Sequence, residues 1–303
     1  MAMKVGIIGA GGIAQYAHIP GYQMVPDVEV VALSDPDTPR ARHAARKFSI
    51  PHVFSNYQDL LKLGLDAVSV CAPNYLHAEA TIAALEAGAH VLCEKPMAMN
   101  AAQAEKMVAA SRRTGKLLMM AYNNRFRREA QALKKLIVAG MLGDVYFARA
   151  AWIRRRGIPS PGSWFGIKAQ SGGGPLIDLG VHVLDLALWL MAEKQAATVM
   201  GATYAKFGNR PEALGSNWAW GEPVAGGRFD VEDMACAMIR FSDGASMFLE
   251  ASWAANIERE QISIHLMGDK GGAQLGGSCD SAKVFTENHG VAQDINLVIP
   301  EPP

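Results

Sequence analysis

The chain has 303 residues, enough for about two domains that each bury a substantial core. Lys plus Arg (29) equal Asp plus Glu (29), and half of the residues are hydrophobic. This balance gives no overall basic field for nucleic acid or for an anionic membrane, so the composition favours a small-molecule partner.

Nothing in the sequence indicates export or membrane insertion. The first expected strand begins within four residues of Met1, which leaves no room for a signal peptide, and we expect no apolar stretch of membrane-spanning length. The four cysteines show no C-x-x-C spacing and are expected to be reduced. The expected location is the cytoplasm.

The N-terminus carries a glycine-rich turn after a short apolar run, Lys4-Val5-Gly6-Ile7-Ile8. In G-x-G-x-x-A, the first glycine permits a tight turn, the second lets the backbone approach a pyrophosphate, and the small final residue lets the next helix pack closely. The phosphates are expected at the start of that helix. The predicted cofactor contacts here are Gly9, Gly11, Gly12, Ile13 and Ala14.

An acid follows the next apolar run, Val28–Leu33. Asp35 stands where a carboxylate accepts hydrogen bonds from both hydroxyls of an adenosine ribose and repels a 2′-phosphate. The sequence therefore favours NAD over NADP. Arg40 and Arg42 lie just downstream, and they leave some NADP binding open; otherwise they belong to a solvated helix face.

Residues 1–122 alternate strand-like runs with helical patterns, which is typical of a parallel sheet. Further strands are expected at 67–71, 90–93 and 117–121. Helices are expected at 79–87 and 101–114, ending at Gly88 and Gly115, which suit left-handed caps. Residues 1–122 are therefore predicted to form a Rossmann domain that binds NAD.

Residues 123–303 show a different pattern and are predicted to form an α+β domain with a large, mostly antiparallel open sheet. This domain is expected to bind substrate and to mediate oligomerisation. Helices are expected at 128–139 and, after Gly172-Gly173-Gly174-Pro175, at 176–191. Strands are expected at 145–153, 199–207, 234–241, 245–254, 261–267 and 273–275.

Two groups of residues suggest acid–base chemistry. Lys95, in Glu94-Lys95-Pro96, falls where a nucleotide-binding fold presents a residue to the nicotinamide. Asp178, His182 and Asp185 are spaced by four and three, so one helix face carries all three. Oxidation of an alcohol needs a base for the hydroxyl proton, which Lys95 or His182 can supply. The alternatives are a solvated lysine, a core histidine and a helix-capping charge. No convincing zinc ligand set is present, and no metal is expected.

Together, the G-x-G-x-x-A turn, Glu94-Lys95-Pro96 and the segment from Gly172 to His182, followed by Asp185 and Trp189, resemble the Gfo/Idh/MocA oxidoreductase family. The match spans nearly the whole chain. It implies a Rossmann domain followed by an α/β domain whose open sheet often forms homodimers or homotetramers. It also implies NAD(P)-dependent oxidation or reduction of sugars, inositols and related polyols.

The resemblance implies roles for individual residues. Lys95, Asp178 and His182 match the family's catalytic lysine and D-x-x-x-H pair, with His182 as proton acceptor, and all three are expected to contact substrate. The Lys95–Pro96 bond is expected to be cis. Cofactor contacts are further implied for Pro73, Asn74, His77, Glu94 and Lys95.

Substrate contacts are also implied beyond these residues. Arg125 resembles a residue that reaches substrate at the start of the second domain. The segment Arg154-Arg155-Arg156 and the segment Ser163-Trp164-Phe165 resemble a substrate-side loop, from which we select Arg156 and Trp164; otherwise the arginines are mostly solvated. The aromatic segment 217–220 is a further candidate. Family members usually continue into a C-terminal helical segment, which is not apparent after residue 297.

The leading hypothesis is an NAD-dependent dehydrogenase acting on a secondary hydroxyl or ketone of a sugar, glycoside or inositol. A second is a reductase of a non-sugar carbonyl or imine. A third is a regulator that senses NAD without turnover. The combination of Lys95, Asp178 and His182 favours chemistry, because a sensor needs no base beside the nicotinamide.

Overall fold

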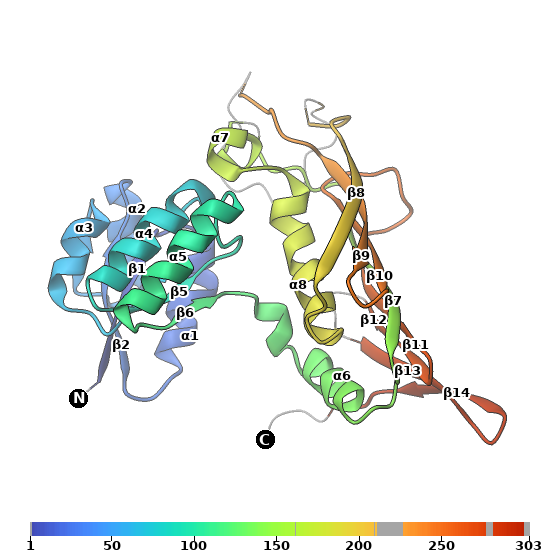
Figure 1. Ribbon diagram of the computed structural model, residues 1–303. Coiled ribbons are helices and arrows are strands. Elements are labelled where there is room, and N and C mark those ends of the chain that lie inside the picture. Colours follow the sequence, from blue (N-terminus) through green and yellow to red (C-terminus); the bar gives the residue numbers. More distant parts are fainter. Residues whose placement is uncertain (1, 161, 209, 211–226, 277–280, 300–303) are drawn as a thin grey trace. The chain divides into compact units, whose positions relative to one another are not determined.

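The computed structural model describes residues 2–160, 162–208, 210, 227–276 and 281–299 (Figure 1). The chain divides into two compact units, each with its own sheet. The first unit comprises Met1–Ala121 and Ala169–Gly172, and the second comprises Tyr122–Lys168 and Gly173–Pro303. A short piece of the later sequence therefore belongs to the first unit.

The first unit is built on a parallel six-stranded sheet of order β3-β2-β1-β4-β5-β6. The order reverses between β1 and β4, which is the point where ligands bind in doubly wound sheets. The strands are β1 (Met3–Ile8), β2 (Val28–Ser34), β3 (His52–Phe54), β4 (Ala67–Val70), β5 (His90–Cys93) and β6 (Leu118–Met120). The helices are α1 (Ile19–Gln23), α2 (Thr38–Phe48), α3 (Tyr57–Leu60), α4 (Asn74–Glu86) and α5 (Ala101–Thr114), with a π turn at Ala14–His18 and a 3₁₀ turn at Leu61–Leu63.

Local sequence explains where these helices begin and end. The Asn100 side chain accepts a hydrogen bond from the Gln103 N–H at the start of α5, which satisfies a backbone donor that the helix leaves unpaired. Gly115 ends α5 in the left-handed conformation, and Gly88, just beyond α4, also has a positive φ. The predicted glycine ends are therefore confirmed.

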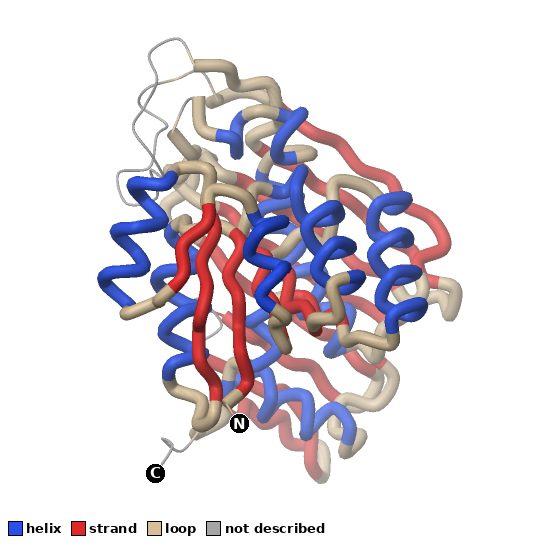
Figure 2. Tube along the Cα trace, turned by 90° about the vertical axis from the view of Figure 1, so that its left-hand side faces the viewer, coloured by secondary structure: helices blue, strands red, loops and turns tan. Residues whose placement is uncertain are grey.

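The second unit is built on an eight-stranded sheet of order β14-β13-β12-β11-β7-β10-β9-β8, in which the β7–β10 pairing is parallel and the other pairings between the described strands are antiparallel. Figure 2 draws the strands of the chain in red and its helices in blue. Its strands are β7 (Val145–Ile153), β8 (Ala196–Tyr204), β9 (Met234–Phe241), β10 (Ser246–Ser252), β11 (Gln261–Gly268), β12 (Gly271–Gly276), β13 (Ser281–Asn288) and β14 (Val291–Asn296). Its helical segments are Asn123–Phe126 (3₁₀), α6 (Arg128–Val138), Trp164–Gly166 (3₁₀), a π turn at Leu176–Gly180 and α8 (Val181–Leu190), while α7 (Lys168–Ser171) crosses the division between the units. The predicted α/β fold with a mostly antiparallel second sheet is confirmed.

One face of this second sheet is core and the other is open. Val183 and Leu186 of α8 pack with Leu249 and Ile264 of the sheet in one buried cluster. On the opposite face, a row of directly paired residues crosses five strands, and paired residues share a face. The row is Met200, Met238, Phe248, Arg149 and His265, of which Met200 and Phe248 are exposed apolar side chains.

Two expectations about the apolar helix need correction. Its first turn, Leu176–Gly180, is a π turn rather than part of a regular α-helix, so the spacing of four between Asp178 and His182 does not have α-helical geometry. In addition, no apolar stretch of membrane-spanning length was expected, but Lys168–Leu190 is long and apolar enough to cross a bilayer. Half of its most apolar window is buried in the protein, as in the core helix of a soluble protein, so length and composition give only weak support for a membrane span.

Candidate active site and cofactor site

The glycine-rich turn connects β1 to the first helical turn at the reversal of strand order. Gly9 has φ of +98°, and a Cβ there would lie 2.5 Å from the Cys71 carbonyl oxygen at the end of β4. Only glycine fits where the backbones of residues 9 and 71 approach so closely. At Gly11, by contrast, a Cβ would meet no heavy atom of the described structure within 4 Å. The open space beside the Gly11 backbone is what the approach of a dinucleotide pyrophosphate requires.

Asp35 follows β2 and is tied to that turn. Its carboxylate accepts hydrogen bonds from the Ala10 N–H at 2.8 Å and the Asp37 N–H at 2.8 Å. The Arg40 guanidinium donates to the same carboxylate at 2.9 Å, while about half of the Arg40 side chain stays exposed. Asp35 therefore presents a negative charge beside the turn, with a cation next to it.

The β4–α4 connection carries three further predicted cofactor residues. Pro73 precedes α4, and Asn74 and His77 lie in its first turn. The Asn74 side-chain amide donates to the Ser171 carbonyl at 2.7 Å, which ties the segment 169–172 to this unit. His77 is only 1% exposed, and its two ring nitrogens lie 2.7 and 2.8 Å from the carbonyl oxygens of Pro96 and Ala72.

The segment Glu94-Lys95-Pro96 follows β5, and its Lys95–Pro96 peptide bond is cis, as predicted. The Glu94 carboxylate is buried, 2.9 Å from His18 Nε2, and it accepts the Lys95 N–H at 3.1 Å. Burial, the largest influence, works to raise the pKa of Glu94. The hydrogen bond from His18, together with the charges of His18 and Lys95 and the Lys95 N–H, holds that pKa below its ordinary value. Glu94 is therefore ionised and points into the unit.

The second unit carries Asp178 in the π turn and His182 in the first turn of α8. Asp178 accepts a hydrogen bond at 2.9 Å from the indole N–H of Trp253, a fully buried side chain. The His182 ring lies 5.6 Å from that of Trp152. The buried Arg154 guanidinium lies 5.7 Å from the same Trp152 ring, so aromatic contacts fix the surroundings of His182.

Arg125, predicted to reach substrate, forms a two-pronged ion pair with Asp185. Its Nε and Nη2 donate to the two carboxylate oxygens at 2.8 and 2.7 Å, and Glu193 lies 3.5 Å from Nη1. Burial, the largest influence, raises the pKa of Asp185 in spite of this pair. The pair joins the start of the second unit to α8, and a substrate contact by Arg125 stays a prediction.

The predicted substrate-side loop places its three arginines in different surroundings. Arg154 is buried, Arg155 is exposed, and Arg156 is half-buried. The Arg156 guanidinium donates to the Ala255 carbonyl at 3.1 Å and to the Asn256 side-chain oxygen at 3.0 Å. Trp164 stacks on Phe165 with ring centroids 3.8 Å apart. The aromatic segment 217–220 lies outside the described residues.

Packing explains the glycine at position 174, just before the π turn. A Cβ at Gly174 would lie 1.9 Å from the Glu232 carbonyl oxygen, so two backbone segments cross there without room for a side chain.

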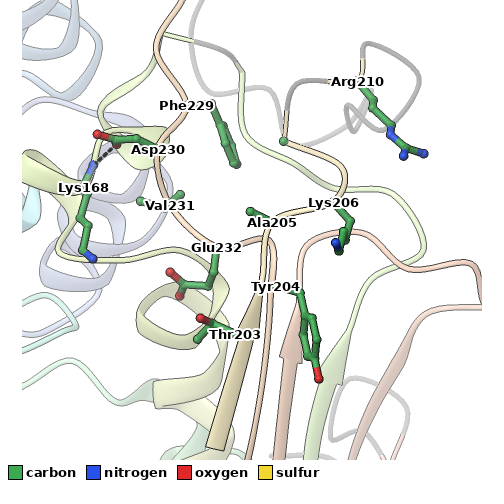
Figure 3. A pocket seen from close by; sticks show the side chains of 11 residues that line it. Lys168, Thr203, Tyr204, Ala205, Lys206, Arg210, Phe229, Asp230, Val231 and Glu232 are labelled. Carbon is green, nitrogen blue, oxygen red and sulfur yellow. Dashed lines mark hydrogen bonds between the residues drawn. The ribbon is translucent and has the colours of Figure 1, made fainter.

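Glu232 also lines a cavity of about 490 Å³ in the second unit. Figure 3 shows its lining, in which the Lys168 N–H donates to Asp230. Other lining residues are Thr203, Tyr204, Lys206, Arg210, Phe229 and Val231.

Within the described part of the chain, no three His, Cys, Asp or Glu residues are grouped so that they could hold a metal ion.

Comparison with known proteins identifies both units. Residues 3–122 match the model of an oxidoreductase family with an NAD-binding Rossmann fold, and residues 130–274 match the Gfo/Idh/MocA C-terminal domain. The chain belongs to the Gfo/Idh/MocA oxidoreductase family. The first unit is accordingly its NAD-binding domain.

Among Gfo/Idh/MocA relatives, D-glucoside 3-dehydrogenase of Escherichia coli (strain K12) is 37% identical over 95% of this chain and 80% of its own. Levoglucosan dehydrogenase of Pseudarthrobacter phenanthrenivorans is 31% identical over 89% of this chain and 72% of its own. A structure of levoglucosan dehydrogenase in complex with NADH matches 98% of this chain and 80% of its own, with a TM-score of 0.84 and 28% identity. These relatives are dehydrogenases named for sugar substrates.

The residues of this Gfo/Idh/MocA chain fit NAD. The open space at Gly11 admits the pyrophosphate, and the Asp35 carboxylate lies hydrogen-bonded to the same turn. Sequence reasoning missed His18 and Trp253, whose partners Glu94 and Asp178 are 76 and 75 positions away. A buried tryptophan usually finds a partner for its N–H, but no sequence signal names that partner.

Proposed function

We propose that this protein oxidises a secondary hydroxyl of a glycoside or related sugar or polyol, with NAD as hydride acceptor, and catalyses the reverse reduction. The observation that carries the proposal is the 37% identity with D-glucoside 3-dehydrogenase over 95% of the chain. Both family domains are present, and the first is the NAD-binding domain.

The first unit would hold the cofactor through the turn from Gly9 to Ala14, through Asp35 and through the loop at Pro73 and Asn74. Bound NAD supplies the acceptor for the hydride that leaves the substrate carbon. The Asp35 carboxylate would accept hydrogen bonds from the ribose hydroxyls and disfavour a 2′-phosphate. The Arg40 guanidinium, which pairs with Asp35 at 2.9 Å, would temper that discrimination.

Lys95 and His182 would handle the proton. As the substrate C–H bond breaks, the C=O bond forms and the hydroxyl proton must leave the oxygen. His182 takes that proton, Lys95 donates a hydrogen bond to the reacting oxygen, and Asp178 orients the His182 imidazole or stabilises its protonated form. Lys95 belongs to the first unit and His182 to the second.

Arg125, Arg156 and Trp164 are proposed to contact the sugar outside the reacting carbon. The Arg125 and Arg156 guanidiniums have planar sets of donors that suit hydroxyl groups, and the aromatic ring suits an apolar sugar face. The stacking of Trp164 on Phe165 supports a preformed aromatic surface. Substitution of each should raise the KM for the sugar more than the KM for NAD.

The test is NADH formation with a panel of glycosides, aldoses and inositols, run in parallel with NADP. A preference for glycosides with NAD supports the proposal. Turnover of only non-sugar carbonyl or imine substrates would favour the alternative reductase. Binding of NAD measured by calorimetry without turnover of any compound would favour a sensor.

We further propose a homodimer or homotetramer formed through the open face of the second sheet, and a cytoplasmic location where NAD is available. The support is the row of paired apolar residues Met200, Met238 and Phe248 on β8, β9 and β10, of which Met200 and Phe248 are exposed. Light scattering should give a multiple of the 32.5 kDa chain mass. Replacing Met200 and Phe248 with lysine should give the monomer, and an unchanged mass would contradict this interface. Cell fractionation tests the location.

A further inference from the structure

The segment that carries Lys95 is held from both sides by buried histidines. On one side, His18 Nε2 lies 2.9 Å from the Glu94 carboxylate, and Glu94 in turn accepts the Lys95 N–H at 3.1 Å. On the other side, His77 Nδ1 lies 2.7 Å from the Pro96 carbonyl oxygen. Each residue flanking Lys95 is thus attached to an imidazole of a different helical segment.

The His18 contacts form a consistent chain of hydrogen bonds. A carboxylate only accepts hydrogen bonds, so His18 Nε2 must carry a proton toward Glu94. His18 Nδ1 lies 3.0 Å from the Ser69 hydroxyl, which lies 2.9 Å from the Tyr22 hydroxyl. His18 is 8% exposed and Ser69 is fully buried. The contacts therefore fix the orientation of the ring, and through it the Glu94 carboxylate.

The His77 contacts join two loops. Its Nε2 lies 2.8 Å from the Ala72 carbonyl oxygen, directly before the predicted cofactor loop, while Nδ1 contacts Pro96. A neutral imidazole donates to one of these carbonyls, and an imidazolium donates to both. Burial, the largest influence, lowers the pKa of His77, while the two carbonyls and Glu94 oppose that shift and Lys95 adds to it. In either state the ring sets the spacing between the two loops.

We propose that His18 and His77 are positioning residues for Lys95, which hold the backbone on either side of it so that its ammonium group meets the reacting oxygen. The inference rests on the proposed function of Lys95. It assigns His18, acting through Glu94, and His77 an effect on turnover that does not require these side chains to touch cofactor or substrate. Misplacing a catalytic group by about 1 Å can cost about a hundredfold in rate.

The test is a double-mutant cycle with Lys95→Ala. In otherwise unchanged protein, His18→Gln and His77→Gln should each lower kcat about tenfold or more with the best sugar substrate. In the Lys95→Ala background, the same substitutions should change kcat by less than about twofold, because the group that they position is gone. His52→Gln, an exposed histidine of the same unit, is the matched control and should leave kcat unchanged in both backgrounds.

Two results would overturn the inference and can be told apart. If Lys95→Ala does not lower kcat, the proposed catalytic role of Lys95 fails and the inference fails with it. If Lys95→Ala lowers kcat but the histidine effects multiply with it, the histidines act independently of Lys95 and only this inference fails. Thermal unfolding reports whether each variant folds. Should His77→Gln not fold, His18→Gln and Glu94→Gln test the other side, with Glu94→Gln expected to follow His18→Gln.

Discussion

Replacement of Asp35 should change the choice of cofactor. A hydrogen bond to a charged group contributes about 1.5–3 kcal/mol, so Asp35→Ala should lower kcat/KM for NAD by about 10- to 150-fold. The substitution also removes the acceptor of the Ala10 N–H, but this loss weakens both cofactors alike and cancels in their ratio. The NADP to NAD ratio of kcat/KM is therefore the quantity to measure.

The neighbouring arginine separates two contributions to that ratio. In the unchanged protein the Arg40 guanidinium donates to Asp35 at 2.9 Å, and in Asp35→Ala it becomes available to a 2′-phosphate. We expect the NADP to NAD ratio of kcat/KM to rise about a hundredfold in Asp35→Ala. In the Asp35→Ala, Arg40→Ala double variant the rise should be about tenfold, because the half-exposed Arg40 cation contributes only modestly to binding a 2′-phosphate. Arg40→Ala alone is the control and should lower NADP use. A ratio that moves less than about threefold in Asp35→Ala would refute the assignment of Asp35 to the ribose.

Three further predictions concern stability and substrate binding. Because the pKa of Glu94 is lower in the folded protein than its ordinary 4.5, its contribution to stability is fully present above about pH 4.5 and lost as the pH falls through the folded-state pKa. Urea unfolding should thus show the stability gap between wild type and Glu94→Gln shrinking below about pH 4.5; a constant gap would contradict this. The Asp233 carboxylate accepts hydrogen bonds from the N–H groups of residues 206–208, so Asp233→Ala should lower the free energy of unfolding by about 2–4 kcal/mol. Urea unfolding at neutral pH measures this change. A decrease of less than about 0.5 kcal/mol would show that these N–H groups find other partners. Arg125→Lys keeps the positive charge but loses the bidentate ion pair with Asp185. Initial rates should show a higher KM for the sugar and an unchanged KM for NAD. An unchanged KM for the sugar would show that Arg125 does not belong to the substrate site.

The elements that the sequence predicted well are those with strong local signals. β7 and β9 were expected over the residues that they occupy, since their apolar runs pack against α8 or neighbouring strands. β13 and β14 were not expected. β14 is exposed along its whole length, and in β13 only Ala282 and Val284 are buried, so the apolar signal of both strands is short and pairing with a neighbouring strand makes them extended. β3 was also not expected, because its three residues are too few to give a periodic pattern, and it forms at the edge of the sheet by pairing with β2.

The candidate site was predictable in its residue types but not in its contacts. Glycines and an acid at fixed spacing indicate a dinucleotide-binding turn, because the backbone geometry of that turn admits few other residue types at these positions. The pairing of Arg125 with Asp185, of Asp178 with Trp253 and of His18 with Glu94 joins residues 60 or more positions apart. Such pairs depend on how the sheets bring distant segments together, which no local pattern encodes.

The most direct test of the proposed acid–base roles is the rate of NADH formation from a glycoside by wild type, Lys95→Ala and His182→Ala, with NAD affinity measured by calorimetry. We expect turnover to be lower by about two orders of magnitude or more in both variants, with NAD affinity largely unchanged. Lys62→Ala, an exposed lysine of the first unit, should behave as wild type. Unchanged turnover in both Lys95→Ala and His182→Ala would contradict the proposed acid–base roles.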